Sequence, residues 1–208
     1  MGRKAFSLIE LLVVVSIIAL LLAIILPSFR SARRQAKMTV CGAHLRQIGV
    51  AMGEYLASHN DRFPYASRFP SMGPLPLETA EPLYIAEVLA DQLKNELDVF
   101  DCPEDRPGKY AREAPNSGKS YIQSERSSYE YRMIVGPPPP GGTFQDMFLA
   151  GKTTDEVSRM ITRVVEEPAP TSAIWYFRDW NGFHAQKNRS QSRNYLHLDG
   201  HVADFEKF

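Results

Sequence analysis

The 208-residue sequence has little cysteine and no excess of charge of either sign. It contains two cysteines, and 24 Lys and Arg residues balance 24 Asp and Glu residues. A neutral chain lacks the positive field with which most nucleic-acid-binding proteins neutralise phosphates, so we predict no nucleic-acid partner. The length allows one domain of ordinary size.

The usual short motifs of hydrolases and nucleotide-binding enzymes are also missing. The sequence has neither Gly-x-Ser-x-Gly nor His-Glu-x-x-His. Gly118-Lys119-Ser120 matches the end of a phosphate-binding loop, but Glu113 occupies the place of that loop's first glycine. We therefore predict that the protein is not an enzyme.

One long apolar run is present near the N-terminus. It covers the 21 residues from Phe6 to Leu26, and Glu10 is its only charged residue. As a helix this run is about 30 Å long, the thickness of the hydrocarbon core of a bilayer. It is followed by Pro27 instead of a small-residue cleavage site, unlike a secretory signal. The run predicts a single membrane span.

Basic residues flank this span on both sides. The leader Met1–Ala5 contains two, and the positive-inside rule would hold it in the cytoplasm and place the rest of the chain outside. We predict this outward orientation. Four basic residues beyond the span favour the opposite one: Arg30, Arg33, Arg34 and Lys37.

Glu10 is the residue that a plain membrane anchor does not explain. A carboxylate in apolar surroundings costs a few kcal/mol unless it is paired. Cleavage between Ala5 and Phe6 would create an α-ammonium on Phe6 in the same layer, and Glu10 of a neighbouring copy could pair with it. Alternatively, Glu10 lies at headgroup depth and stays solvated.

The string from Lys4 to Leu11, KAFSLIEL, resembles the class III signal of type IV prepilins and type II secretion pseudopilins. The resemblance implies a type IV pilin-like fold and cleavage between Ala5 and Phe6, with methylation of Phe6, by a prepilin peptidase. It also implies that Glu10 guides assembly. Ala5 replaces the glycine that is commonest at the cut site. The implied partners are that peptidase, other pilin-like subunits and an inner-membrane assembly platform.

Beyond Pro27, the spacing of apolar residues predicts that the helix continues. A stripe with steps of four and three consists of Cys41, Leu45, Ile48, Met52 and Tyr55. We expect one helix of about 50 residues, which Pro27 bends but does not end and whose outer half packs against a sheet. The predicted fold class is α+β, with a small antiparallel sheet.

The chain is thus divided into a leader at 1–5, a membrane half of the helix at 6–27, an outer half at 28–60 and a globular head at 61–208. In the head, a helix is expected over Pro82–Leu97. Strands are expected over Ser128–Val135, Met160–Glu166, Ser172–Phe177, Tyr195–Leu198 and His201–Phe205.

The two cysteines, Cys41 and Cys102, would both lie outside the inner membrane, where a disulfide can form. Such a bond would close a loop of about 60 residues. Cys41 equally fits a buried apolar stripe as a free thiol.

Asp199-Gly200 predicts a two-residue type I′ turn that joins the last two strands. The segment resembles that of pseudopilin-like proteins that end in a His, nine residues and Asp-Gly, although here fourteen residues separate His184 from Asp199. His197 and His201 fit a cross-strand pair as well as a metal site. We predict no metal and no cofactor. Calcium is the alternative, bound by Asp199, Asp204 or the cluster Asp101, Glu104 and Asp105.

Together these features predict a structural subunit of a type IV pilus-like filament or a type II secretion pseudopilus. Its predicted location is the bacterial inner membrane, crossed once, with the head in the periplasm or on an extracellular filament. A minor tip subunit is an alternative within this class. The alternative from another class is a single-pass, membrane-anchored extracytoplasmic binding domain or metal-dependent enzyme.

Overall fold

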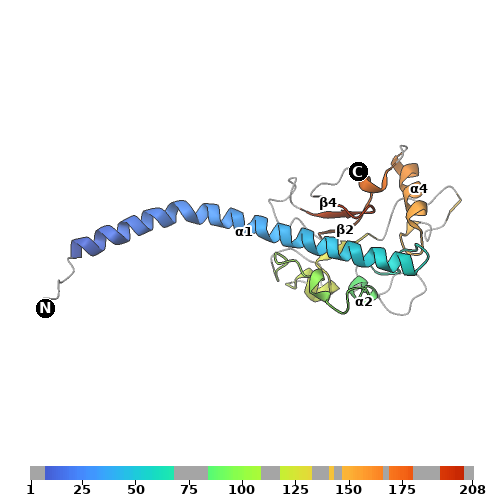
Figure 1. The fold of residues 1–208 in the computed structure, drawn as a ribbon, viewed down its shortest axis with the longest axis horizontal. Coiled ribbons are helices and arrows are strands. Elements are labelled where there is room, and N and C mark those ends of the chain that lie inside the picture. Colours follow the sequence, from blue (N-terminus) through green and yellow to red (C-terminus); the bar gives the residue numbers. More distant parts are fainter. Residues whose placement is uncertain are drawn as a thin grey trace. The chain divides into compact units, whose positions relative to one another are not determined.

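The computed structural model describes residues 8–67, 84–108, 118–132, 141–142, 147–165, 169–179 and 193–203 (Figure 1). The chain forms two compact units, Met1–Ala36 and Lys37–Phe208. The second unit is the head.

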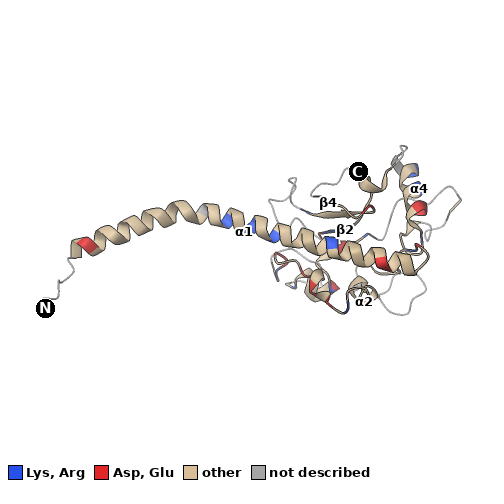
Figure 2. Cartoon of the chain, viewed as in Figure 1, with Lys and Arg blue, Asp and Glu red and all other residues tan. Residues whose placement is uncertain are grey.

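The dominant element is α1, a single helix of 51 residues over Leu8–Ser58. The prediction of one long helix is confirmed, and Pro27 does not end it. Between Glu10 and Arg30 the helix carries no charged side chain (Figure 2). Proline removes one backbone hydrogen bond from a helix, and the regular turns on both sides of Pro27 keep the helix continuous.

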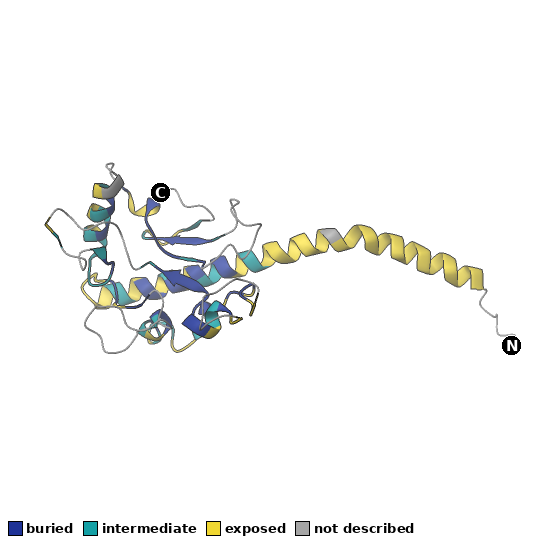
Figure 3. Cartoon of the chain, turned by 180° about the vertical axis from the view of Figure 1, so that it is seen from behind, coloured by how far each residue is buried: buried dark blue, intermediate teal, exposed yellow. Residues whose placement is uncertain are grey.

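In the head, one face of α1 forms the centre of the hydrophobic core (Figure 3). The side chains of Cys41, Leu45, Ile48 and Met52 are fully buried and Tyr55 is partly buried against the same core, which confirms the apolar stripe expected from the sequence. The opposite face, which includes Arg46 and Glu54, is exposed.

A four-stranded antiparallel sheet packs against this face of α1. Its order is β1-β2-β3-β4, and the strands are β1 (Tyr129–Tyr131), β2 (Trp175–Asp179), β3 (Tyr195–His197) and β4 (Val202–Ala203). The α+β fold with a small antiparallel sheet is therefore confirmed. Trp175, Tyr176 and Phe177 are all buried in the head.

The expected strand at Met160–Glu166 is wrong, because Met160 to Val165 belong to helix α4 (Thr154–Val165). The β-branched residues of this stretch favoured a strand, but its start has strong helix signals. The Thr153 hydroxyl accepts a hydrogen bond from the Glu156 N–H, and the Glu156 carboxylate accepts one from the Thr153 N–H, a capping box. Asp61, just after α1, accepts a hydrogen bond from the Thr154 N–H at 3.0 Å.

The helix expected over Pro82–Leu97 is also shorter than predicted. Among its described residues, from 84 onward, only α2 (Ile85–Val88) is α-helical, and a 3₁₀ turn, η2 (Leu97–Phe100), follows after a series of turns. Lys94 and Asn95 have φ angles of 52° and 62°, which are incompatible with a right-handed helix. The remaining short elements are α3 (Tyr121–Glu125) and η4 (Thr171–Ala173).

Gly49 sets the distance between α1 and the sheet. A Cβ atom added at this position would lie 3.0 Å from the Cδ1 atom of Leu196 in β3. At Gly53, one turn later, an added Cβ would meet nothing within 4 Å. The two glycines therefore have different roles in the same helix.

Gly49→Leu should lower the free energy of unfolding of the head by about 1–3 kcal/mol, because the larger side chain overpacks the contact with Leu196. The matched variant Gly53→Leu should be neutral or more stable by up to about 1 kcal/mol, since leucine is the better helix former. Denaturant unfolding of the full-length chain in detergent compares them. A Gly49→Leu protein as stable as the wild type would contradict the close packing.

Candidate functional site: the N-terminal assembly segment and the head clamp

The first turns of α1 present apolar side chains on every side. From Leu8 to Leu26 each Leu, Ile and Val side chain is between 47% and 81% exposed in the single chain. The helix is long and apolar enough to cross a membrane. An apolar surface of this extent requires lipid or other protein chains to cover it. We call the residues Leu8–Leu26 the assembly segment.

Glu10 lies in the first turn of α1, among these apolar residues. A carboxylate is favourable there because the first turn is the positive end of the helix dipole. The hydroxyl of Ser16 donates a hydrogen bond to the Val13 carbonyl oxygen at 2.8 Å, so this polar group is satisfied within the helix. Ala5 and Phe6, the expected cleavage site, lie outside the described residues.

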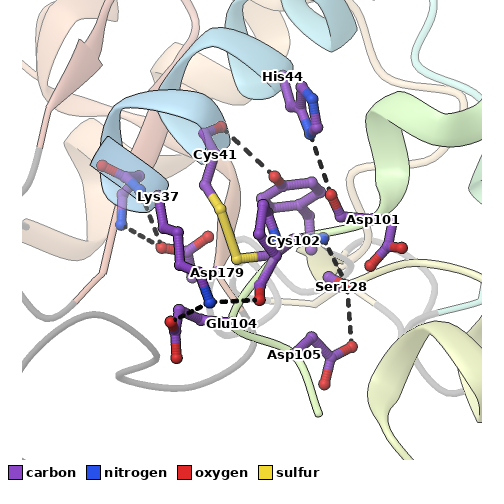
Figure 4. The surroundings of a disulfide bond; sticks show 12 residues. Lys37, Cys41, His44, Asp101, Cys102, Glu104, Asp105, Ser128 and Asp179 are labelled. Atoms are coloured by element: carbon purple, nitrogen blue, oxygen red, sulfur yellow. Dashed lines mark hydrogen bonds and ion pairs between the residues drawn. A yellow bond between two sulfur atoms is a disulfide. The ribbon is translucent and has the colours of Figure 1, made fainter. Parts of the chain in front are cut away.

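In the head, a disulfide joins Cys41 of α1 to Cys102, with the two Cα atoms 5.5 Å apart (Figure 4). Both cysteines are fully buried. One turn further along α1, the Nδ1 atom of His44 lies 3.0 Å from the Asp101 carbonyl oxygen. The Tyr129 hydroxyl donates to the Cys41 carbonyl oxygen at 3.4 Å, which connects β1 to the same turn of α1.

A partly buried ion pair lies one turn before the disulfide. The Nζ atom of Lys37 is 2.6 Å from the Glu104 carboxylate, and it donates a second hydrogen bond to the Pro103 carbonyl oxygen at 3.2 Å. Both charged side chains are largely shielded, at 15% and 11% exposed. We call this arrangement, from Lys37 to His44 on α1 and from Asp101 to Glu104 on the loop, the head clamp.

Asp105 extends the clamp into the rest of the head. Its carboxylate accepts hydrogen bonds from the backbone N–H groups of Tyr121 and Ile122, at 3.0 and 2.8 Å, and from the Ser128 hydroxyl at 2.8 Å. The Ser128 oxygen in turn accepts a hydrogen bond from the Cys102 N–H at 3.0 Å. The Asp105 side chain thereby caps α3 and fixes the loop beside the disulfide.

Two of the three acidic side chains considered for calcium, those of Glu104 and Asp105, form contacts within the protein. Glu104 forms the ion pair of the clamp, and Asp105 binds α3 and Ser128. Within the described part of the chain, no group of three or more His, Cys, Asp or Glu residues could hold a metal ion. The calcium alternative stays a prediction, since one of its residues, Asp204, lies outside the described residues.

The terminal hairpin differs from the predicted two-residue turn. Type I′ requires positive φ at both central residues, but only Gly200, at 86°, has it, whereas Asp199 does not. The Gly200 N–H donates to the His197 carbonyl oxygen at 2.8 Å, and the His197 N–H donates to the His201 carbonyl oxygen at 3.0 Å. This pattern is a three-residue loop, a turn followed by a left-handed glycine.

The histidines of the hairpin pack against each other across it. The rings of His197 and His201 are stacked with centroids 4.2 Å apart. The Nδ1 atom of His201 lies 2.6 Å from the Asp199 carboxylate. His184, the histidine considered for the C-terminal motif, lies outside the described residues.

Comparison with known proteins gives one family match and one similar curated protein. Residues 1–26 match the family described as the prokaryotic N-terminal methylation motif. The chain carries a prepilin-type N-terminus. It is also similar to the type IV wide pilus major component PilA4 of Thermus thermophilus, with 50% identity over 59 residues.

This similarity covers 28% of the chain and 45% of PilA4, so less than half of that relative's length is matched. No solved structure matches the chain. The prepilin-type N-terminus contains Ala5, Phe6 and Glu10 and the whole assembly segment.

The two cysteines of the clamp are evident in the sequence, but its other contacts are not. The sequence presents Lys37 only as a charge that bears on topology, and its pairing with Glu104 requires two segments 67 residues apart to meet. The string of acidic residues from Asp101 to Asp105 was the available signal, because buried acidic side chains need donors or cations.

Reducing the disulfide should lower the free energy of unfolding of the head by about 2–4 kcal/mol, because the open chain gains conformational freedom when it unfolds. Denaturant unfolding with and without reductant measures this. A variant with both Cys41→Ala and Cys102→Ala should not respond to reductant. Two free thiols in the unreduced, denatured wild type would contradict the disulfide.

The hairpin should contribute a pH-dependent stability through Asp199. Partial burial alone would raise the pKa of Asp199, but hydrogen bonds from the His201 side chain and N–H outweigh this effect and hold the pKa below its usual value. A lowered pKa stabilises the folded state above the ordinary carboxyl pKa, and this stability is lost as the pH falls through the folded-state pKa.

The difference in free energy of unfolding between the wild type and Asp199→Asn should therefore be present at about pH 5 and disappear toward about pH 2. Chemical denaturation at a series of pH values measures it. A difference that does not change with pH would show that the charge of Asp199 has no role in the hairpin.

Proposed function

We propose that the protein is a structural subunit of a type IV pilus-like filament or a type II secretion pseudopilus. The observation that carries the proposal is an exposed apolar helix with a single carboxylate in its first turn, inside a prepilin-type N-terminus. In this proposal the chain first crosses the bacterial inner membrane once, with the head in the periplasm or, after assembly, on the filament.

Processing then prepares the helix for assembly. A prepilin peptidase removes residues 1–5 and leaves an ammonium group on Phe6, which is methylated. Phe6 is four residues before Glu10, so both charges of a processed chain belong to the same end of the helix. Because these opposite charges lie in apolar surroundings, each gains from pairing with the other on an adjacent copy.

Assembly replaces the lipid around the apolar assembly segment with the helices of other subunits. Inside the membrane, lipid covers the assembly segment, and outside it only the corresponding segments of other subunits can do so. The apolar faces give no fixed register along the helix axis, because their side chains are alike. The pairing of Glu10 with the Phe6 ammonium of a neighbour sets that register, and an inner-membrane platform supplies the subunits.

The head clamp suits a subunit of a filament. It fastens a loop of the head to α1 over the turns from Lys37 to His44, the first turns of the head unit. A pull along α1 therefore acts on the disulfide and on the Lys37–Glu104 pair together. The clamp keeps the head folded on the helix when subunits are drawn along the filament.

Glu10→Ala should leave the chain folded and membrane-inserted but reduce its incorporation into filaments about tenfold or more, because a neighbour's ammonium group loses its partner in an apolar layer. The experiment compares membrane and sheared-filament fractions in cells that carry the assembly machinery.

The matched control is Glu54→Ala, which removes an exposed carboxylate from the head part of the same helix and should leave incorporation unchanged. Normal incorporation of the Glu10→Ala variant would refute the role proposed for Glu10.

A further inference from the structure

Three arginines follow the assembly segment on α1. Arg30, Arg33 and Arg34 are all exposed. At 1.5 Å per residue, Arg30 lies about 6 Å and Arg34 about 12 Å beyond Leu26 along the helix. The polar headgroup region of a bilayer begins where the hydrocarbon ends and is about 5–8 Å thick on each side, so the backbone of Arg30 lies within it and the long side chains of Arg33 and Arg34 can reach it. A chain whose assembly segment spans the membrane thus carries these guanidinium groups at headgroup depth.

The helix provides no acidic neighbour for these arginines. Between Glu10 and Glu54 the sequence of α1 contains no Asp or Glu, so none of them has a carboxylate three or four residues away. Lys37, the next basic residue, differs from them because its side chain forms the ion pair with Glu104 in the head. The positive charges on this part of α1 that have no acidic neighbour on the helix are therefore those of Arg30, Arg33 and Arg34.

The spacing of the three residues places them around one side of the helix. Positions 30, 33 and 34 are three and four residues apart and are neighbours on a helical surface. Figure 2 shows basic residues gathered in this part of α1, after a long stretch without charge. Arginine binds phosphate through two parallel hydrogen bonds and releases its hydration water readily, so closely spaced arginines suit phosphate groups.

We propose that Arg30, Arg33 and Arg34 bind the phosphates of anionic lipid headgroups in the leaflet where the span ends. The proposal rests on the proposed function only in that the chain spans a membrane before assembly. It accounts for basic residues at an end of the span where they oppose the outward orientation. If residues 1–5 are removed, Arg3 and Lys4 are lost, and these arginines become the basic residues nearest to the span.

The consequence is a fixed depth for the unassembled subunit. A basic group that is bound to headgroups resists movement of the helix along the membrane normal, because such movement drags charge into the hydrocarbon or away from the lipid surface. The arginines would thereby hold the opposite end of the span, with Glu10, at a constant level. Incorporation into the filament requires these lipid contacts to be broken.

The test uses the full-length chain reconstituted into phosphatidylcholine vesicles that contain traces of spin-labelled phosphatidylglycerol or spin-labelled phosphatidylcholine. The fraction of immobilised label reports which lipid contacts the protein. The wild type should prefer phosphatidylglycerol, and the preference should fall at least about threefold when Arg30, Arg33 and Arg34 are all replaced by Gln. High salt should weaken the preference of the wild type.

The matched control is Arg46→Gln, since Arg46 is an exposed arginine of the same helix about 18 Å beyond Arg34 and should not affect the preference. Equal association of the two lipids with the wild type, or an unchanged preference in the triple variant, would overturn the proposal. Self-association that depends on the three arginines but not on lipid charge would overturn it in favour of a second copy of the chain.

Flotation of the vesicles at alkaline pH separates this proposal from the proposed function. A chain that floats but shows no lipid preference contradicts only the lipid contact. A chain that does not float contradicts both, because the assembly segment then does not span the bilayer.

Discussion

The exposed apolar surface of Leu8–Leu26 is the constraint on which the other features depend. Its side chains point in all directions around α1, so no single packing partner on one face could cover them. Exposure of these side chains to water is unfavourable, whereas lipid or the corresponding helices of other subunits can surround the helix completely. In the proposed function the subunit passes from the first environment to the second, and Glu10, the one charged residue of the segment, distinguishes positions along it.

The head has to stay attached to the helix through that change. Its core uses the continuation of α1, where Leu45, Ile48 and Met52 pack under a four-stranded sheet. The clamp adds a covalent bond and a shielded ion pair at the first turns of this region. The Glu104 carboxylate also lies 3.6 Å from the Arg106 guanidinium, so this acidic side chain keeps a second basic neighbour beside Lys37. Asp105 and Ser128 connect this region to α3 and β1 through hydrogen bonds.

The features that depend on the spacing of apolar residues along one helix could be predicted from the sequence. The assembly segment and the buried stripe of α1 depend on the period of one helix, and both appear where expected. The strand expected at Met160–Glu166 is wrong because the β-branched residues of this stretch favour a strand, while the capping box at Thr153 and Glu156 that starts α4 lies outside it. The prediction of a type I′ turn is wrong for a similar reason. The dipeptide Asp199-Gly200 does not show how many residues the loop contains, which depends on the pairing of β3 with β4.

The clamp could not be predicted in full, because its contacts join residues that are far apart in the sequence. The distance between Cys41 and Cys102 is set by the packing of the head, so composition alone left both a disulfide and a buried thiol open. The acidic residues near Cys102 fit turn residues or calcium ligands by sequence. In the structure Glu104 contacts Lys37 and Arg106, and Asp105 accepts hydrogen bonds from Ser128 and from the N–H groups at the start of α3. The contact with Lys37 becomes visible only when the loop is placed against α1.

The central claim is that this helix is prepared for assembly by processing at its N-terminus. Intact mass and N-terminal peptide analysis of the protein from its native membrane tests it most directly. The account predicts a chain that begins at N-methylated Phe6, with an ammonium group four residues from Glu10. A membrane protein that still begins at Met1 or Gly2 would leave Glu10 without the cationic partner proposed for it and would contradict the account.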